Sequence, residues 1–236
     1  MSRRTVIILV IALAVVCVLG IGGYYWYQGS QFVSTDDARV SADMVSVSPE
    51  IPGRLLEWRV KEGDSVSKDD ELGRQDLGTA LTSGALNPQT LGAIAGVTAE
   101  KAILKAPIAG QVILSSAVVG ELAAPGMSLA TIADTDNLYI SVNVKEGDIE
   151  RVSQGQAVDV WVDAFHGRTF HGRVETIGRA TASTFSLLPS QDSGGSYTKV
   201  VQVIPIKVSL LDRQGVPLMV GMNASVRIYV NPATKE

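Results

Sequence analysis

Residues 5–27 form a run of apolar and small side chains without a single charge. As an α-helix this run would be ~35 Å long, which is enough to cross a bilayer. Two arginines precede the run, and two aspartates follow it. This asymmetry predicts a cytoplasmic tail at residues 1–4, a transmembrane helix at 5–27 and an extracytoplasmic location for the rest of the chain. The bulky aromatic residues at 24–27 argue against a cleaved signal peptide.

Two later stretches repeat one hydrophobic pattern at an interval of 57 residues. Each has short alternations of apolar and polar residues on either side of a charged turn, which predicts short strands. A unit of this size cannot bury its apolar face alone. We therefore expect residues 45–76 and 102–135 to be two lipoyl-like halves that interlock as one flattened sandwich.

Four glycines mark equivalent places in the two copies. We predict structural turns, where a β-carbon would strain the backbone, at Gly53, Gly63, Gly110 and Gly120. The alternation in the adjacent strands also predicts which side chains face the core. These are Leu56, Trp58, Val60, Val112 and Leu114.

The segment between the two halves has a different character. Residues 77–100 contain four glycines, no heptad pattern and a single charge at Glu100. Glycine disfavours helix, although Asn87 followed by Pro88 is a plausible helix start. We expect residues 77–101 to be a short helical hairpin insert, with helices that project only ~15 Å. It is either an apolar contact for partners or a plain linker, and its low polarity slightly favours contact.

From residue 136 the alternation becomes longer and more regular. Several strands separated by turns predict a small β-barrel domain at 136–232, with one helical turn at 146–152 and a tail at 233–236. Residues 28–44 are expected to be a linker and barrel edge. The fold class is thus mainly β, with an N-terminal transmembrane helix, a split sandwich with a short insert, and a barrel.

The amino-acid composition argues against several classes of function. The chain has 236 residues, 24 acidic and 20 basic side chains and a net charge of −4, which argues against nucleic acid as a partner. Two histidines and one cysteine leave little for a metal site or a disulfide framework. His166 and His171 are interpreted as surface turn residues, because no third ligand is suggested nearby. No catalytic, cofactor-binding or metal residue is predicted, so an enzyme is not expected.

Four motifs in order carry a family resemblance. They are "STDDARV", "VSVSPEIPGRL" with "VKEGDSVSKDDEL", "ILKAPIAGQV", and "TFSLLPSQDSGGSYTKVVQVIPIKV". Behind an anchor with a cytoplasmic N-terminus, they resemble the periplasmic adaptor (membrane-fusion) proteins of the HlyD/EmrA type. The chain departs from that family at Arg39, where an aromatic is usual, and in the insert, where members usually carry a long coiled-coil hairpin.

The resemblance implies a non-catalytic, barrel-sandwich hybrid adaptor in the cell inner membrane. Its partners would be an inner-membrane transporter, of the major-facilitator type in the EmrA branch or an ABC exporter, and copies of itself in a head-to-tail ring. Many relatives also reach an outer-membrane channel, which this short insert puts in doubt. The predicted partner-contact residues are Leu86, Asn87, Pro88, Leu91, Phe185, Leu187 and Leu188.

Two other functions compete with this interpretation. The chain could be a membrane-tethered binding or structural module without a pump. It could also be a lipoyl or biotinyl carrier, since Lys101 in "EKA" is similar to a lipoylation context. The long insert before Lys101 argues against a carrier, whose attachment turn must be tight.

Overall fold

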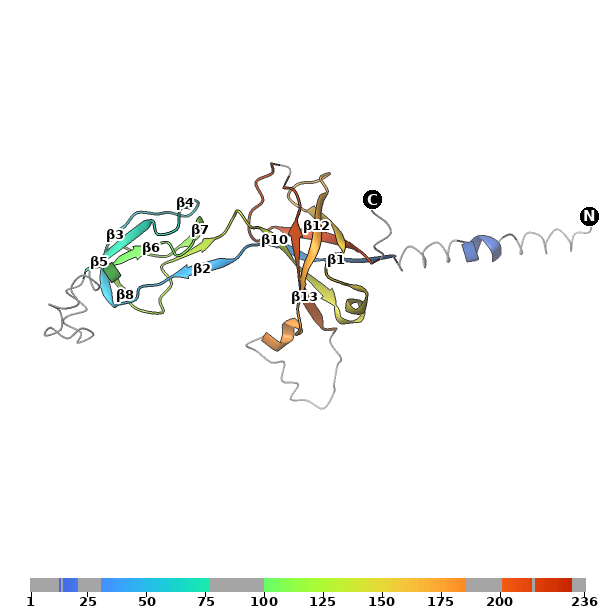
Figure 1. Ribbon diagram of the computed structural model, residues 1–236, viewed down its shortest axis with the longest axis horizontal. Helices are drawn as coiled ribbons and strands as arrows, with labels where there is room; N and C mark the ends of the chain where they lie inside the picture. The colour runs from blue at the N-terminus through green and yellow to red at the C-terminus, as the bar shows by residue number, and fades with distance from the viewer. Residues whose placement is uncertain are drawn as a thin grey trace, which may run out of the picture. The chain divides into compact units, whose positions relative to one another are not determined.

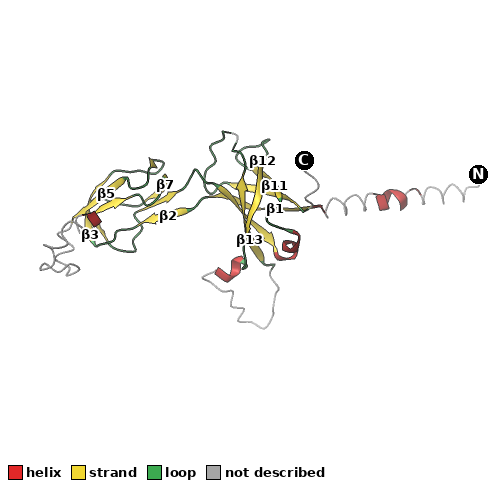
Figure 2. Cartoon of the chain, in the orientation of Figure 1, coloured by secondary structure: helices red, strands yellow, loops and turns green. Residues whose placement is uncertain are grey.

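The computed structural model describes residues 13, 15–20, 31–76, 100–185, 201–213 and 215–230. These residues form fourteen strands and two 3₁₀ helices (Figures 1 and 2). The chain divides into two units, one comprising Met1–Ser41 with Tyr139–Glu236 and the other Ala42–Leu138.

The first unit is a closed six-stranded antiparallel barrel with the order β1-β10-β13-β12-β11-β14. Its strands are β1 (Phe32–Ser41), β10 (Tyr139–Lys145), β11 (Ala157–Val162), β12 (Phe170–Ile177), β13 (Val203–Leu210) and β14 (Asn223–Tyr229). Alternate residues point inward and form one core, as the alternation predicted. Its most deeply buried side chains include Val40, Ile140, Val142, Val160, Phe170, Val208 and Ile228.

β1 is a full member of this barrel, which corrects the expected linker and barrel edge at residues 28–44. It pairs with β10 on one side and with β14 on the other, so no edge remains. A bulge between Thr35 and Ala38 shifts its register. Because the bulge changes which alternate residues point inward, the strand does not show one continuous alternation in the sequence.

The second unit is a sandwich of two four-stranded sheets, with the orders β2-β9-β7-β4 and β6-β5-β3-β8. Its first-half strands are β2 (Met44–Val47), β3 (Gly53–Trp58), β4 (Ser65–Val66) and β5 (Glu71–Asp76). Its second-half strands are β6 (Ile103–Lys105), β7 (Gly110–Ser115), β8 (Leu122–Ala123) and β9 (Ala130–Ala133). Each sheet contains two strands from each half, so the halves interlock as the repeat predicted.

The sandwich core is built from two clusters of buried side chains. One includes Leu72, Val112 and Ile132, and the other includes Leu55 and Leu129. The half-buried Trp58 packs against both clusters. Its Nε1 donates a hydrogen bond of 2.9 Å to Oγ of Ser115, which is the residue 57 positions later. One side chain therefore joins equivalent places in the two halves.

Two of the predicted core residues are exposed, which is a second correction. Leu56 and Leu114 are each 50% exposed. β-bulges lie between Leu55 and Glu57 and between Val112 and Leu114, and each inserts one residue into the strand. The alternation read from the sequence therefore assigns the wrong face on one side of each bulge.

Other local predictions fall close to the observed elements. The 3₁₀ helix η1 (Glu146–Arg151) occupies the predicted helical turn, and η2 (Ala182–Phe185) follows β12. Within the residues that the structure describes, no helix is long and apolar enough to span a bilayer. Most of the predicted anchor at 5–27 lies outside those residues.

Candidate functional site

The two glycine turns of the sandwich are geometrically equivalent. Gly63 has φ 93° and Gly120 has φ 91°, a conformation that side chains with a β-carbon rarely adopt. The Gly63 N–H donates to the carbonyl of Val112 at 2.8 Å, and the Gly120 N–H donates to that of Leu55 at 2.7 Å. Each turn thus binds a strand of the other half.

Gly53 and Gly110 are placed differently from the predicted turns, since they are the first residues of β3 and β7. A β-carbon on Gly53 would lie 2.8 Å from the carbonyl oxygen of Asp76. On Gly110 it would lie closer still to the carbonyl oxygen of Ala133. Both positions require close approach of a neighbouring strand, and Gly110 also has a positive φ, at 155°.

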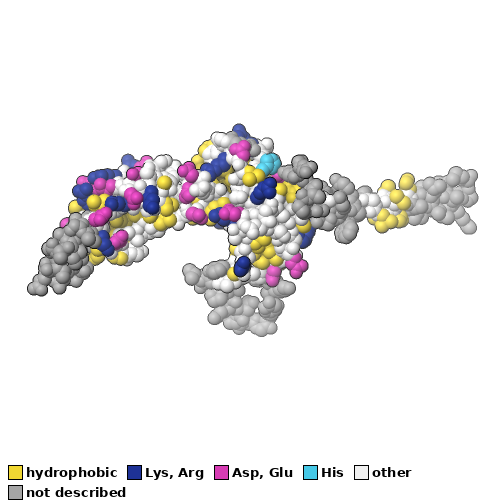
Figure 3. Space-filling view, viewed as in Figure 1, with side chains coloured by type: hydrophobic (Ala, Val, Ile, Leu, Met, Phe, Trp, Pro, Cys, Tyr) yellow, Lys and Arg dark blue, Asp and Glu magenta, His cyan; other side chains and the backbone are white. Residues whose placement is uncertain are grey.

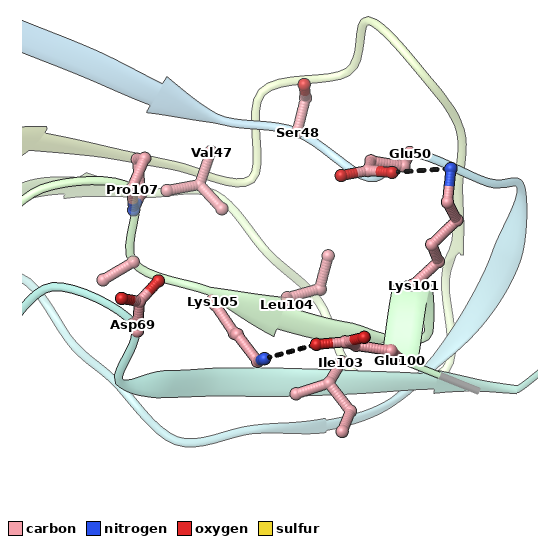
Figure 4. A pocket seen from close by; sticks show the side chains of 11 residues that line it. Val47, Ser48, Glu50, Asp69, Glu100, Lys101, Ile103, Leu104, Lys105 and Pro107 are labelled. Carbon is pink, nitrogen blue, oxygen red and sulfur yellow. Dashed lines mark hydrogen bonds and ion pairs between the residues drawn. The ribbon is translucent and has the colours of Figure 1, made fainter. Parts of the chain in front are cut away.

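A hollow of about 390 Å³ lies beside β6, where the insert rejoins the sandwich (Figure 4). Its rim carries two ion pairs, Lys101 with Glu50 at 3.0 Å and Lys105 with Glu100 at 3.2 Å. All four side chains are 40–70% exposed, so the pairs contribute little stability. Lys101, the candidate carrier residue, thus has its amine paired with the Glu50 carboxylate. The residues that line the hollow include no cysteine or histidine.

Two exposed apolar side chains lie on strands β8 and β3 of the β6-β5-β3-β8 sheet. Leu122 of β8 lies opposite Arg54 of β3, and it is 54% exposed. Leu56, two residues along β3, is also half exposed, and Val118 and Val119 in the preceding loop are more exposed still. Figure 3 shows apolar side chains interspersed with charged ones on this unit. Such a surface is suited to protein contact, although its apolar part is small.

The outer wall of the barrel contains a polar network that sequence reasoning missed. Asp159 of β11 is only 7% exposed, and its carboxylate binds two partners. His171 Nδ1 lies 2.8 Å from Oδ1, and the Tyr229 hydroxyl donates to Oδ2 at 2.6 Å. His171 lies in strand β12 and not in a turn, which corrects the interpretation of this histidine. It is a neighbour of Asp159 because of the register between β11 and β12, which the sequence alone does not give.

Arg227 of β14 lies beside this network on the same wall. Its guanidinium is 5.5 Å from the ring centroid of Phe32 and 5.3 Å from that of Trp161. Trp161 is fixed by a hydrogen bond from Nε1 to Oγ1 of Thr169, at 3.0 Å. The Arg227 guanidinium therefore lies within cation–π distance of one aromatic ring on β1 and one on β11.

Most of the predicted partner-contact residues lie outside the described residues. These are Leu86, Asn87, Pro88, Leu91, Leu187 and Leu188. Phe185 is the last residue of η2, and only its backbone is described. The partner-contact role of this set therefore stays a prediction.

Apart from the buried Asp159, the charged side chains in the described part of the chain are at least partly exposed to solvent. There, no group of three or more His, Cys, Asp or Glu side chains is arranged to hold a metal ion. The Arg59 guanidinium, 2.8 Å from Glu57, lowers the pKa of that carboxyl, and Glu57 in turn raises the pKa of Arg59. Both side chains are about half exposed.

Two family models match the chain in sequence order. Residues 43–135 match the barrel-sandwich hybrid domain of RND membrane-fusion proteins, and residues 137–193 match a CusB-like β-barrel domain. The two matches fall on the sandwich and on the barrel. The matched barrel region does not include β1.

Individual proteins are similar to the chain over different lengths. A putative efflux system component YhbJ of Bacillus subtilis is 36% identical over 202 residues, which cover 85% of this chain and 81% of the relative. The probable multidrug resistance protein EmrK of Escherichia coli is 34% identical, over 53% of this chain but only 33% of its own length. The structure of the periplasmic adaptor protein EmrA has a TM-score of 0.51 at 14% identity, and the likeness covers 85% of this chain and 99% of that one.

Proposed function

This chain belongs to the EmrA-type membrane-fusion (periplasmic adaptor) family, and from that premise we propose that it is the adaptor subunit of a multidrug or secretion efflux system. It couples an inner-membrane transporter, of the major-facilitator type in our proposal, to export across the envelope. It works without catalysis, by assembling with the transporter and with copies of itself.

One observation carries this proposal. The interlocked sandwich is inserted in the chain between β1 and the other strands of the six-stranded barrel, and each unit matches an adaptor domain model. Fold alone does not give function, but the similarity to YhbJ extends over most of both chains. We propose the domain limits 45–76 and 102–135 for the two halves, around the insert at 77–101.

The pump function is tested by isolating the full-length chain from its own membranes. A transporter should co-purify with it after crosslinking, and deletion of the gene should lower export of a fluorescent drug substrate. Complementation with the intact gene should restore that export. Crosslinks found only between copies of this chain, together with unchanged export in the deletion strain, would favour a tethered module without a pump.

We further propose that residues 5–27 anchor the chain, with the N-terminus in the cytoplasm. The uncharged run and the arginines before it support this topology. Alkaline phosphatase fused after Glu236 should be active, because it folds only outside the reducing cytoplasm. A β-galactosidase fusion at the same place should be inactive, and the reverse pattern would overturn the topology.

The insert is proposed as a contact for the transporter or for neighbouring copies. Leu86 and Leu91 lie in a segment with almost no charge, which a free linker normally would not be. Replacing both by aspartate should reduce transporter crosslinking without lowering the amount of chain in the membrane. Equal crosslinking in that variant would favour a plain linker.

A further inference from the structure

The hollow beside β6 lies along the edge of that strand that pairs with no other described strand. β6 is the outermost strand of the β6-β5-β3-β8 sheet and pairs only with β5. The hollow is lined by residues from 47–50 and 100–107 and by Asp69, and no residue of β5 is among them. It is therefore on the side of β6 that faces away from β5 (Figure 4).

The register of β6 identifies the backbone groups that point into the hollow. Alternate residues of an antiparallel strand direct both their N–H and their C=O groups to the same neighbour. The Ala102 carbonyl accepts a hydrogen bond from the N–H of Gln75 in β5, at 2.8 Å, so Leu104 also directs its backbone groups to β5. Ile103 and Lys105 therefore direct theirs away from β5. These two residues offer two donors and two acceptors to an added strand.

The opposite wall of the hollow is the equivalent place in the other half of the repeat. Residues 47–50 precede residues 104–107 by 57 positions, and both segments line the hollow. β2, which ends at Val47, is also an edge strand of its sheet. Val47 and Leu104 are each only 4% exposed and give the hollow an apolar lining. An open side between two sheet edges is suited to an extended segment that adds a strand.

The lysines of the hollow do not oppose such an addition. Lysines on an edge strand normally discourage pairing, because an incoming strand would cover an unpaired ammonium group. Here Lys101 is paired with Glu50 at 3.0 Å, and Lys105 is paired with Glu100 at 3.2 Å. An added strand therefore covers no unpaired cation.

One carboxylate of the hollow has no such partner. In the described part of the chain Asp69 takes part in no ion pair, and its N–H donates to the Ala106 carbonyl at 2.8 Å. In Figure 4 it lies at the end of the hollow opposite Lys101. Three carboxylates and two ammonium groups surround the hollow, so the local charge is negative. A segment with one basic side chain complements that charge.

From this arrangement we propose that the hollow binds an extended segment of a partner protein, which adds a strand to β6 and places a lysine or arginine side chain against Asp69. β6 has three residues, so the added strand makes contact over roughly 10 Å. A contact this short is weak alone and suits a partner that is already held nearby. The inference goes beyond the proposed function, since it assigns a peptide-binding edge to the sandwich.

A tethered peptide tests strand addition on the full-length protein in detergent micelles. The chain has one cysteine, so a Cys17→Ala background with Ser48→Cys gives one thiol on the rim of the hollow. A disulfide to the peptide Cys-Gly-Gly-Thr-Val-Lys-Val brings the peptide to an effective concentration on the order of millimolar. The amides of Ile103 and Lys105 should then exchange hydrogen about tenfold more slowly by NMR. The Leu104 amide, which faces β5, should be protected in both states and reports a folded sandwich.

Matched changes separate the hydrogen bonds of the strand from its charge. Ile103→Pro removes a donor of the free edge without breaking a bond to β5, and it should abolish the protection of Lys105. Ser46→Pro, at the equivalent place on the free edge of β2, is the control and should keep that protection. A peptide with a methylated backbone should protect neither amide. Asp69→Asn, or glutamate in place of the peptide lysine, should reduce the protection about fivefold.

The possible results distinguish the occupants of the hollow. Unchanged exchange at both edge amides, or equal protection by the methylated peptide, would overturn strand addition. Equal protection by the lysine and glutamate peptides would overturn the basic side chain. Protection that rises with protein concentration in the absence of peptide would show that a second copy occupies the edge, and would also overturn the proposal. None of these results depends on the export assay, so the pump function stands or fails separately.

Discussion

The sandwich and the barrel close their cores in different ways. In the sandwich, neither half has a complete sheet, and each sheet takes two strands from each half. This exchange needs close backbone approach at equivalent glycines, as at Gly53 and Gly110. The barrel has no such repeat and closes one sheet with β1, around a core of mainly valine and isoleucine side chains that also contains the completely buried Phe170. Equivalent pairs of close-approach glycines are therefore particular to the sandwich, although a β-carbon would also lie 2.6 Å from a carbonyl oxygen on Gly172 and Gly178 of the barrel.

The largest effect should come from Phe170→Ala in the barrel. The ring is completely buried, so its removal should lower the free energy of unfolding of that unit by about 4 kcal/mol. Hydrogen exchange of the full-length protein should show lost protection at barrel amides, while sandwich amides keep theirs. Phe165→Ala, at a half-buried turn position, is the control and should have a much smaller effect. Equal loss in both units would show that they unfold together.

The next largest effect should come from Gly110→Ala in the sandwich. The new β-carbon would overlap the Ala133 carbonyl, and we expect a loss of about 3 kcal/mol. Gly53→Ala should cost less, because the equivalent contact with Asp76 is longer, at 2.8 Å, and because Gly53 lacks the positive φ of Gly110. Hydrogen exchange of sandwich amides measures both. Gly147→Ala, where nothing lies within 4 Å, should not destabilise, and equal losses at Gly53 and Gly110 would contradict this ordering.

The repeat made much of the sandwich predictable, because its glycines and its alternation recur at a fixed interval. Alternation gives the face of a side chain but not the partner of its strand, so the exchange of strands between the sheets could not be derived. It also fails at bulges, where an extra residue changes the face. That is why Leu56 and Leu114 were assigned to the core although each is 50% exposed.

The barrel shows the same limit more strongly. The bulge at Asp36 and Asp37 interrupts the alternation of apolar and polar residues in the ten-residue strand β1. The hydrophobic pattern of this segment is therefore that of a linker as much as that of a strand. Asp159 and His171 are twelve positions apart, and only the β11–β12 register makes them neighbours. Contacts that depend on register are set by the whole sheet, and a local pattern does not reveal them.

Smaller effects are expected at the two glycine turns. Gly63→Ala and Gly120→Ala meet no atom within 4 Å, so their cost comes only from positive φ. Each should destabilise the sandwich by about 1 kcal/mol, and the two values should agree because the turns have nearly equal φ. Thermal unfolding of the full-length variants measures this. A large difference between the two would show that the halves are equivalent in backbone but not in stability.

The smallest effect is expected at two equivalent positions of the repeat that differ in residue type but share a similar backbone conformation. Asp69 has φ 69°, and Gly126, 57 positions later, has φ 88°. Aspartate tolerates this conformation better than most residues, but still at some cost. Asp69→Gly removes that cost and also loosens the unfolded chain, so we expect a gain of about 0.5 kcal/mol at most. Gly126→Asp should destabilise by a similar amount. Thermal unfolding of both variants measures the two changes. A clear loss of stability in Asp69→Gly would contradict this expectation. It would mean that the Asp69 side chain, on the rim of the hollow beside β6, has a stabilising role that its backbone conformation does not explain.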